Sequence, residues 1–173
     1  MGLNLINIIM EVEDEIDKDF IYIIKESFPL FNVSVFHSAF TGIIGQLDVD
    51  QMYDECERFN KWDKYGVKSF DDIAEKIYEF EDEIIKFSKI YSNKIFGYIV
   101  VDCTGGMCFY EGFAVSNGNI ILKHKGAKDG HVNILKEINK KYDGYYFKPF
   151  TREFIRRNEK GQQDSIARNG LGN

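Results

Sequence analysis

The sequence predicts one α+β domain in which helices cover an antiparallel β-sheet. Apolar residues recur at helical spacing in residues 3–27 and again in residues 70–91, and their period changes to two after residue 93. The two-residue turn Asn117-Gly118, which favours a tight hairpin, lies within the segment of period two. A chain of 173 residues, 44% of them hydrophobic, can bury a core of its own as a single domain.

The first 48 residues predict a helix followed by two strands. Apolar residues at steps of three and four indicate an amphipathic helix over roughly residues 3–27, which ends before Pro29. Alternating residues predict a strand over Phe31–His37 and a second one over Ala39–Leu47. The outer face of the expected helix is strongly acidic and includes Glu11, Asp14 and Glu15.

Two further helices are expected in the middle of the chain. Asp48 and Gln51 resemble a capping box, which predicts a short helix that Gly66 ends. Ser69 is a good N-cap for a long helix with a strict 3-4 apolar repeat. The repeat consists of Phe70, Ile73, Ile77, Phe80, Ile84, Phe87 and Tyr91. Phenylalanine in such a seam favours packing inside the domain, and a dimer seam is the alternative.

The last part of the domain predicts a three-stranded meander over residues 95–124, with strands at Ile95–Asp102, Met107–Val115 and Asn119–His124. A helix over Val132–Tyr142, an edge strand over Tyr145–Phe150 and a short helix over Thr151–Glu159 are expected to follow. The domain then comprises residues 1–160 and about five strands, and residues 161–173 form a disordered tail. This order resembles that of profilin-like and roadblock-like domains, which implies a five-stranded antiparallel sheet covered by helices and carries no function.

The cysteines and the N-terminus indicate the compartment. Three cysteines are too few to form a disulfide framework, so Cys103 and Cys108 are expected to be two reduced thiols across a hairpin. The N-terminus lacks the basic region of a signal peptide, and no apolar run is long enough to span a membrane. A cytoplasmic location is therefore predicted. The Cys-x4-Cys spacing is too wide for the usual zinc pair, and neither a metal nor a cofactor is expected.

One loop offers a possible ligand site. Lys125, Lys128 and His131 belong to a basic, glycine-containing segment just before a predicted helix, where backbone N–H groups can bind phosphate. The segment has neither Walker nor dinucleotide-binding spacing. The three histidines lie in three different elements and no catalytic constellation is evident, so the sequence favours a protein that is not an enzyme.

The charge distribution indicates the kind of partner. Residues 1–93 contain 20 acidic and 9 basic residues, which repel nucleic acid and attract basic protein surfaces. The expected contacts are Glu11, Asp14 and Glu15 on the first helix and Glu75, Glu79 and Glu83 on the long one. Ile, Lys, Asn and Tyr make up 61 of the 173 residues, which suggests an AT-rich source such as a phage or mobile element.

These observations favour a protein that inhibits another protein, of the kind found among bacterial immunity proteins, antitoxins and phage-encoded inhibitors. The partner is expected to be a protein with a basic surface, and neither a membrane nor a nucleic acid is expected to bind. Two alternatives stay open. One is a small nucleotide- or phosphate-binding enzyme or regulator that uses residues 123–131. The other is a scaffolding homodimer that uses the seam of the long helix.

Overall fold

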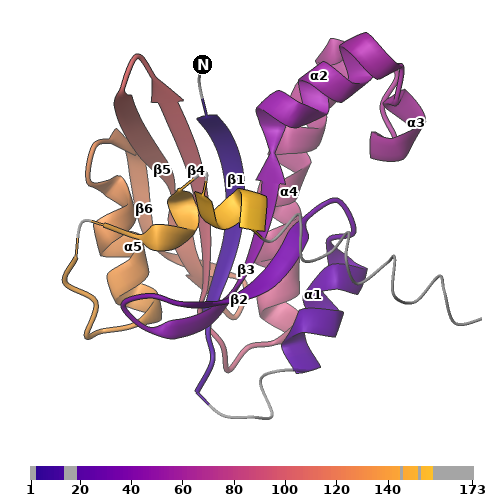
Figure 1. Cartoon of the computed structure of the whole chain (residues 1–173). Coiled ribbons are helices and arrows are strands. Elements are labelled where there is room, and N and C mark those ends of the chain that lie inside the picture. Colours follow the sequence, from indigo (N-terminus) through magenta and orange to yellow (C-terminus); the bar gives the residue numbers. More distant parts are fainter. Residues whose placement is uncertain (1–2, 14–18, 145, 152, 158–173) are drawn as a thin grey trace, which may run out of the picture.

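The computed structural model describes residues 3–13, 19–144, 146–151 and 153–157, and shows an α+β fold built on one antiparallel sheet (Figure 1). The six strands lie in the order β2-β3-β1-β4-β5-β6. Their bounds are β1 (Leu3–Glu11), β2 (Asn32–His37), β3 (Thr41–Asp48), β4 (Phe96–Thr104), β5 (Met107–Ser116) and β6 (Asn119–Ala127). The predicted class is therefore confirmed, with six strands in place of about five.

The helices connect and cover these strands. They are α1 (Phe20–Ser27), α2 (Val49–Phe59), α3 (Trp62–Tyr65), α4 (Phe70–Ile90) and α5 (Gly130–Ile138), followed by a 3-10 turn η2 (Lys148–Phe150). Residues 153–157 are helical, as the sequence predicts for this segment. The predicted strand over Tyr145–Phe150 is wrong for its described residues, because Pro149 lies in η2. The tail over residues 161–173 lies outside the described residues.

The predicted helix over residues 3–27 is wrong. Residues 3–11 form β1, which pairs with β3 on one side and β4 on the other, and among the described residues of the segment the α-helix is α1. Both faces of β1 are covered, so its residues from Leu5 to Met10 are all buried. A strand buried on both faces has a nearly continuous apolar run, and such a run also fits helical spacing. The first element is therefore β1, which lies inside the sheet between β3 and β4. The order of elements thus differs from the expected order, in which a helix came first.

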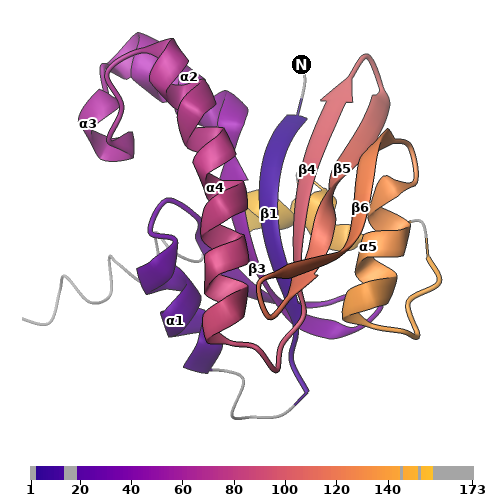
Figure 2. The same ribbon diagram turned by 180° about the vertical axis from the view of Figure 1, so that it is seen from behind.

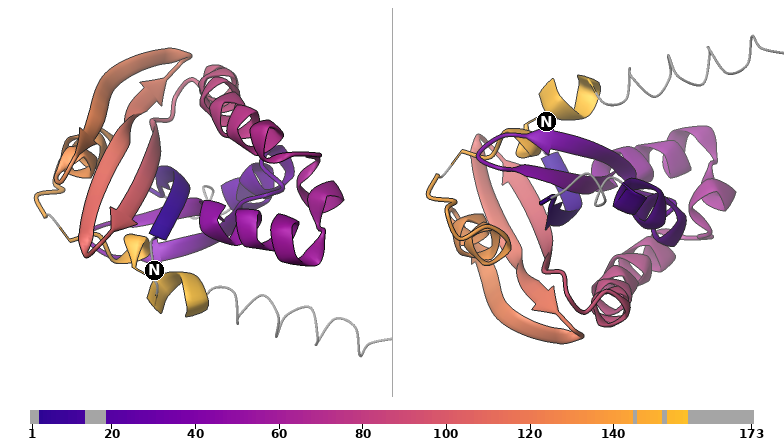
Figure 3. Two further views of the ribbon diagram at one scale, coloured as in Figure 1. Left: turned by 90° about the horizontal axis from the view of Figure 1, so that it is seen from above. Right: turned by 90° about the horizontal axis from the view of Figure 1, so that it is seen from below.

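Helices lie on both faces of the sheet. Figures 1 and 2 show α1, α2 and α4 on one face, and Figure 3 shows α5 on the far side of β4, β5 and β6. The first face buries Ile6, Ile8 and Met10 of β1, and the second buries Leu5 and Ile9. The alternation along one strand thus supplies both cores. The apolar seam of α4 packs into the first core through Ile73, Phe80, Ile84 and Phe87, as predicted for packing inside the domain.

Backbone conformation at the Asn117-Gly118 turn and at Gly112 determines how β4, β5 and β6 pair. Asn117 and Gly118 both have positive φ, at 49° and 73°, which is the geometry of the predicted hairpin turn. The pairing of β5 with β6 is irregular between Tyr110 and Gly112. Gly112 has a φ of 148°, and a Cβ there would lie 1.9 Å from the carbonyl oxygen of Tyr98. A side chain at this position would therefore push β5 away from β4.

A pair of buried amides links the centre of the sheet to the C-terminal segment. Asn7 of β1 and Gln46 of β3 are cross-strand partners, and both are almost fully buried. Asn7 Nδ2 donates to the carbonyl oxygen of Ile99 at 3.0 Å. Gln46 Nε2 donates to Asn7 Oδ1 and to the carbonyl oxygen of Pro149, each at 2.9 Å. Both amide nitrogens of the pair and Asn7 Oδ1 are thus hydrogen-bonded inside the sheet, where water is excluded.

Candidate functional site

Helix α4 carries a row of acidic residues. Ser69 caps it by accepting a hydrogen bond from the backbone N–H of Asp72. Glu75, Glu79 and Glu83 follow at intervals of four residues, so they lie on one side of the helix about 6 Å apart along its axis. Glu75 and Glu79 are exposed and Glu83 is half-buried. The structure therefore brings these three predicted residues together.

Tyr78 lies beside this row and is 74% exposed. Glu75 and Asp82 are three residues before it and four residues after it, so both carboxylates lie next to the ring on the helix surface. Two basic residues lie close to the row: Lys76, whose Nζ lies 3.6 Å from Glu79 Oε2, and the exposed Lys86, which follows Glu83 by three residues. The outer surface of α4 thus combines an exposed aromatic ring with surrounding negative charge. We call Glu75, Tyr78, Glu79, Asp82 and Glu83 the acidic face.

Of the other predicted acidic set, Glu11 does not lie on a helix. Glu11 ends β1, where its Oε1 accepts a hydrogen bond from Asn139 Nδ2 at 2.5 Å. Asp14 and Glu15 lie outside the described residues. The expected position of Glu11 on a helical face is therefore wrong, because Glu11 belongs to a strand.

The predicted phosphate-binding residues do not converge. Lys125 lies on the exposed part of β6, and Lys128 lies in the turn that follows. His131 is in the first turn of α5 and is only 2% exposed. Its ring lies 4.0 Å from the ring of Tyr110 and 5.9 Å from that of Phe150, so it belongs to the second core. The sequence places His131 correctly at a helix start but does not reveal that its side chain turns inward.

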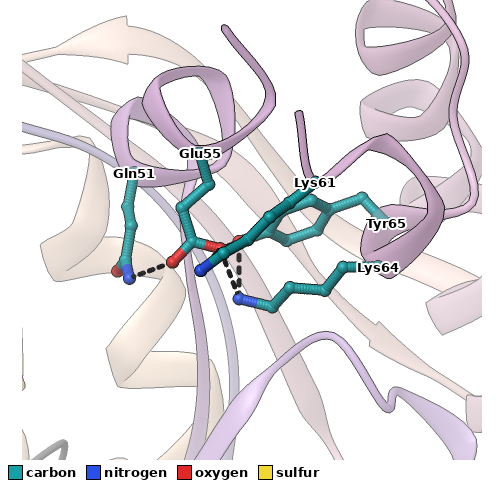
Figure 4. Close-up of polar contacts among 5 residues, drawn as sticks. All are labelled: Gln51, Glu55, Lys61, Lys64 and Tyr65. Carbon is teal, nitrogen blue, oxygen red and sulfur yellow. Dashed lines mark hydrogen bonds and ion pairs between the residues drawn. The ribbon is translucent and has the colours of Figure 1, made fainter. Parts of the chain in front are cut away.

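A polar network at the junction of α2 and α3 was not predicted (Figure 4). Glu55 Oε2 accepts hydrogen bonds from Lys64 Nζ at 2.6 Å and from the Tyr65 hydroxyl at 3.0 Å. Glu55 Oε1 accepts one from Gln51 Nε2 at 3.1 Å, and Lys61 Nζ lies 3.5 Å from Oε2. Desolvation by burial raises the pKa of Glu55, but the hydrogen bonds from Lys64, Gln51 and Tyr65 outweigh it and lower the pKa to about 2. The Glu55 carboxylate therefore stays ionised in the folded protein, and hydrogen bonds from Gln51, Lys64 and Tyr65 fix its position.

A pocket of about 300 Å³ adjoins this network. Its lining comes from β1, β2, β3, α2 and α3, from the segment before β2 and from the C-terminal helical segment. The lining residues are Leu5, Pro29, Leu30, Asn32, Gln46, Leu47, Asp48, Gln51, Lys64, Tyr65 and Ile155. One part of this lining was predicted, because Asp48 caps α2 by accepting a hydrogen bond from the backbone N–H of Gln51, as the capping box indicates. The remaining residues meet through strand pairing that spacing does not reveal.

Cys103 and Cys108 form a disulfide across the β4–β5 hairpin. They are direct cross-strand partners, with Cα atoms 4.0 Å apart. The expectation of two reduced thiols is therefore wrong. Disulfides persist in oxidising compartments, so the cysteines do not support the cytoplasmic location, which stays a prediction. Cys56 is free and buried, and burial raises its pKa.

Among the described residues, no three or more His, Cys, Asp or Glu side chains are grouped so that they could hold a metal ion. In the same part of the chain no helix is both long enough and apolar enough to cross a membrane.

Comparison of the chain with protein-family models, with curated proteins and with solved structures found no match.

Proposed function

We propose that this protein binds and inhibits another protein through the acidic face of α4, in the manner of an immunity protein, an antitoxin or a phage-encoded inhibitor. The observation that carries the proposal is the exposed Tyr78 within a row of carboxylates. Exposed tyrosines are frequent anchors of protein interfaces. The carboxylates would attract a partner with a basic surface and set its orientation.

The geometry favours this proposal over the two alternatives. The seam that would form a scaffolding dimer packs against the sheet within the domain, through Ile73, Phe80, Ile84 and Phe87. The residues of a phosphate site are divided between an exposed strand and the buried core, as Lys125 and His131 show. The acidic face, by contrast, is exposed at Glu75, Tyr78, Glu79 and Asp82.

The test begins with a pulldown from the native host to obtain a partner, followed by association kinetics at low and high salt. The triple variant Glu75→Lys, Glu79→Lys and Glu83→Lys should slow association by about tenfold or more at low salt and have less effect at high salt, because screening shortens the range of these charges. Tyr78→Ala should mainly speed dissociation, because it removes an anchor.

A matched control changes the charge by the same amount elsewhere. Asp102, Glu111 and Asp129 are exposed and lie outside α4, so their change to lysine should slow association much less. The predicted set Glu11, Asp14 and Glu15 is reversed in a further variant, which tests whether this segment adds to the attraction. A partner that associates with the α4 triple as fast as with the wild type, at a rate that salt does not change, would show that the acidic face serves solubility alone.

A further inference from the structure

Strand β6 forms one border of the sheet (Figure 2). Among the strands of the described chain, β5 is the one that pairs with it, so the backbone on the other side of β6 has no strand next to it. β6 is nine residues long, Asn119–Ala127, and contains no proline. An edge strand of this kind presents a row of backbone N–H and C=O groups to which a further strand can pair. This border of the sheet is therefore open to an added strand.

The side chains beside this edge are exposed on the face of the sheet that carries α4. Ile120 and Lys123 are cross-strand partners of two β5 residues that are buried in the first core, so both point to the first face. Lys125 follows Lys123 by two residues and points the same way. Ile120 is 43% exposed and its neighbour Ile121 is 46% exposed. The edge thus carries two exposed apolar side chains followed by two lysines.

The charge of these lysines is not neutralised within the domain. Lys123 and Lys125 are exposed, as is Lys128 in the turn after β6, and in the described part of the chain none of the three forms an ion pair. Glu111 of β5 is exposed on the same face, and within the same residues it forms no ion pair either. The border at β6 is therefore a basic strip on a chain whose net charge is -6.

The lysines determine which strand can be added. Lysine on an edge strand discourages pairing with most other strands. A second copy of β6 would bring two Lys123 and two Lys125 side chains together, and like charges opposite each other destabilise a pair of strands. An acidic strand instead places a carboxylate across from each lysine, and opposite charges on paired strands stabilise them. The same two residues thus disfavour self-pairing and favour an acidic partner.

From this complementarity we propose that β6 binds an extended acidic segment of another protein, which adds a strand to the sheet. Acidic residues at every second position face Lys123 and Lys125, and an apolar residue on the same side packs on Ile120 and Ile121. A nucleic acid would also bring negative charge, but the acidic face of α4 lies on the same side of the sheet and repels it. The site shares no residue with the acidic face, so either proposal can fail without the other.

The probe is the peptide Val-Thr-Glu-Thr-Glu-Thr-Val with blocked ends. Its side chains have the same order in both directions, so it suits parallel and antiparallel pairing, and valine and glutamate share one face. Backbone amide NMR and hydrogen exchange follow the titration. The peptide should shift the β6 amides in a saturable manner and slow exchange of alternate β6 N–H groups, while β2 at the other border stays unchanged. If β6 does not respond, or if β2 responds as strongly, the proposal is wrong.

Two control peptides separate charge from strand pairing. Val-Thr-Lys-Thr-Lys-Thr-Val reverses the charge and should bind about tenfold more weakly or worse. The second control keeps both glutamates but is N-methylated at the central threonine and at the glutamate after it. Successive N–H groups of a strand point to opposite sides, so one of the two must face β6, and binding should again fall about tenfold. Equal binding of the N-methylated peptide would mean attachment by charge alone and would overturn the proposal.

A single-stranded oligothymidylate is titrated in parallel. Tighter binding of this oligonucleotide than of the acidic peptide at the same β6 amides would identify a nucleic-acid surface and contradict the proposal. Strong loss of binding with added salt is expected for the oligonucleotide, whereas backbone pairing of the peptide should persist in part.

Paired variants locate the peptide on β6. Lys123→Gln combined with Lys125→Gln should weaken binding of the acidic peptide by about tenfold. Lys25→Gln combined with Lys68→Gln removes the same charge from exposed positions on α1 and before α4, and should change binding less than twofold. All four side chains are exposed, so both double variants should melt near the wild-type temperature. Equal losses of binding from the two double variants would overturn the assignment to β6.

Discussion

Glu55 links α2 to α3 through its carboxylate, which stays ionised in the folded protein. Because its pKa falls from 4.5 to about 2 on folding, the stabilisation is complete above pH 4.5 and is lost as the pH falls from there towards 2. Glu55→Gln keeps the shape but cannot ionise. At pH 7 it should lower the free energy of unfolding by roughly 1–2 kcal/mol, because its partner Lys64 is 50% exposed and solvent screens part of the interaction.

The measurement is urea unfolding of the wild type and of Glu55→Gln at several pH values between 7 and 2.5. The difference between the two should shrink as the pH falls below 4.5, since the Glu55 carboxyl of the unfolded chain then takes up a proton while that of the folded protein stays ionised until about pH 2. Glu57→Gln is the control, because Glu57 is exposed on the same helix. A difference that is independent of pH would show that the network does not depend on the charge of Glu55.

Gln46 supports the sheet and the C-terminal segment together. Gln46→Leu removes both donors and leaves Asn7 Oδ1 and the Pro149 carbonyl without them, which should cost about 2–4 kcal/mol. Adding Asn7→Leu replaces the amide pair by apolar groups, so the double variant should lose less than the sum of the two single changes. A double-mutant cycle by urea unfolding measures this coupling, and additive losses would mean that the two amides do not act as a pair.

At the level of elements, α4 has clearly different faces. Ile84 is fully buried, Ile77 is partly buried and Tyr78 is 74% exposed. Ile84→Asp should therefore cost about 4 kcal/mol or more, and Ile77→Asp should cost less, though still a few kcal/mol. Tyr78→Asp is the matched control and should change the free energy of unfolding by about 0.5 kcal/mol or less. Urea unfolding measures how much each of the three variants lowers the free energy of unfolding. Similar losses for Ile84→Asp and Tyr78→Asp would contradict the packing of α4.

The elements also show what the sequence can and cannot predict. Local signals were sufficient for α4, with its Ser69 cap and regular seam, and for the hairpin at Asn117-Gly118. They failed for β1, because a strand buried on both faces lacks the alternation that identifies strands. The same error placed Glu11 on a helical face. Local signals placed Cys103 and Cys108 across a hairpin, but the direct opposition that allows the disulfide depends on the register of the two strands.

The candidate site was predicted in part for the same reason. Glu75, Glu79 and Glu83 belong to one helix, so their spacing alone places them together. The pocket residues Gln46 and Lys64 come from a strand and a helix that meet only in the folded chain. Their roles depend on Asn7 and Glu55, which hold the two side chains in place. Chemistry that is assembled from distant segments leaves no local pattern in a single sequence.

At the scale of the whole molecule, the C-terminal segment completes the second core. Phe147, Phe150 and Ile155 are buried there, with Phe150 next to His131 and Phe147 next to Phe36 and Phe40. The carbonyl oxygen of Pro149 also accepts from Gln46, which connects this segment to the centre of the sheet. Helix α5 covers β4, β5 and β6, so the region around β3 on this face depends on the C-terminal segment for its cover.

Deleting residues 146–173 should therefore abolish cooperative unfolding, because burial of three large side chains is lost from a domain whose stability is marginal. Deleting residues 161–173, which contain few apolar residues, should leave the melting temperature nearly unchanged and is the matched control. In the full-length chain, Phe150→Ala should cost about 3–5 kcal/mol, which tests the packing even if the longer deletion gives insoluble protein. Near-UV circular dichroism and thermal unfolding report on all three. A protein ending at residue 145 that melts cooperatively at the wild-type temperature would show that the second core closes without this segment.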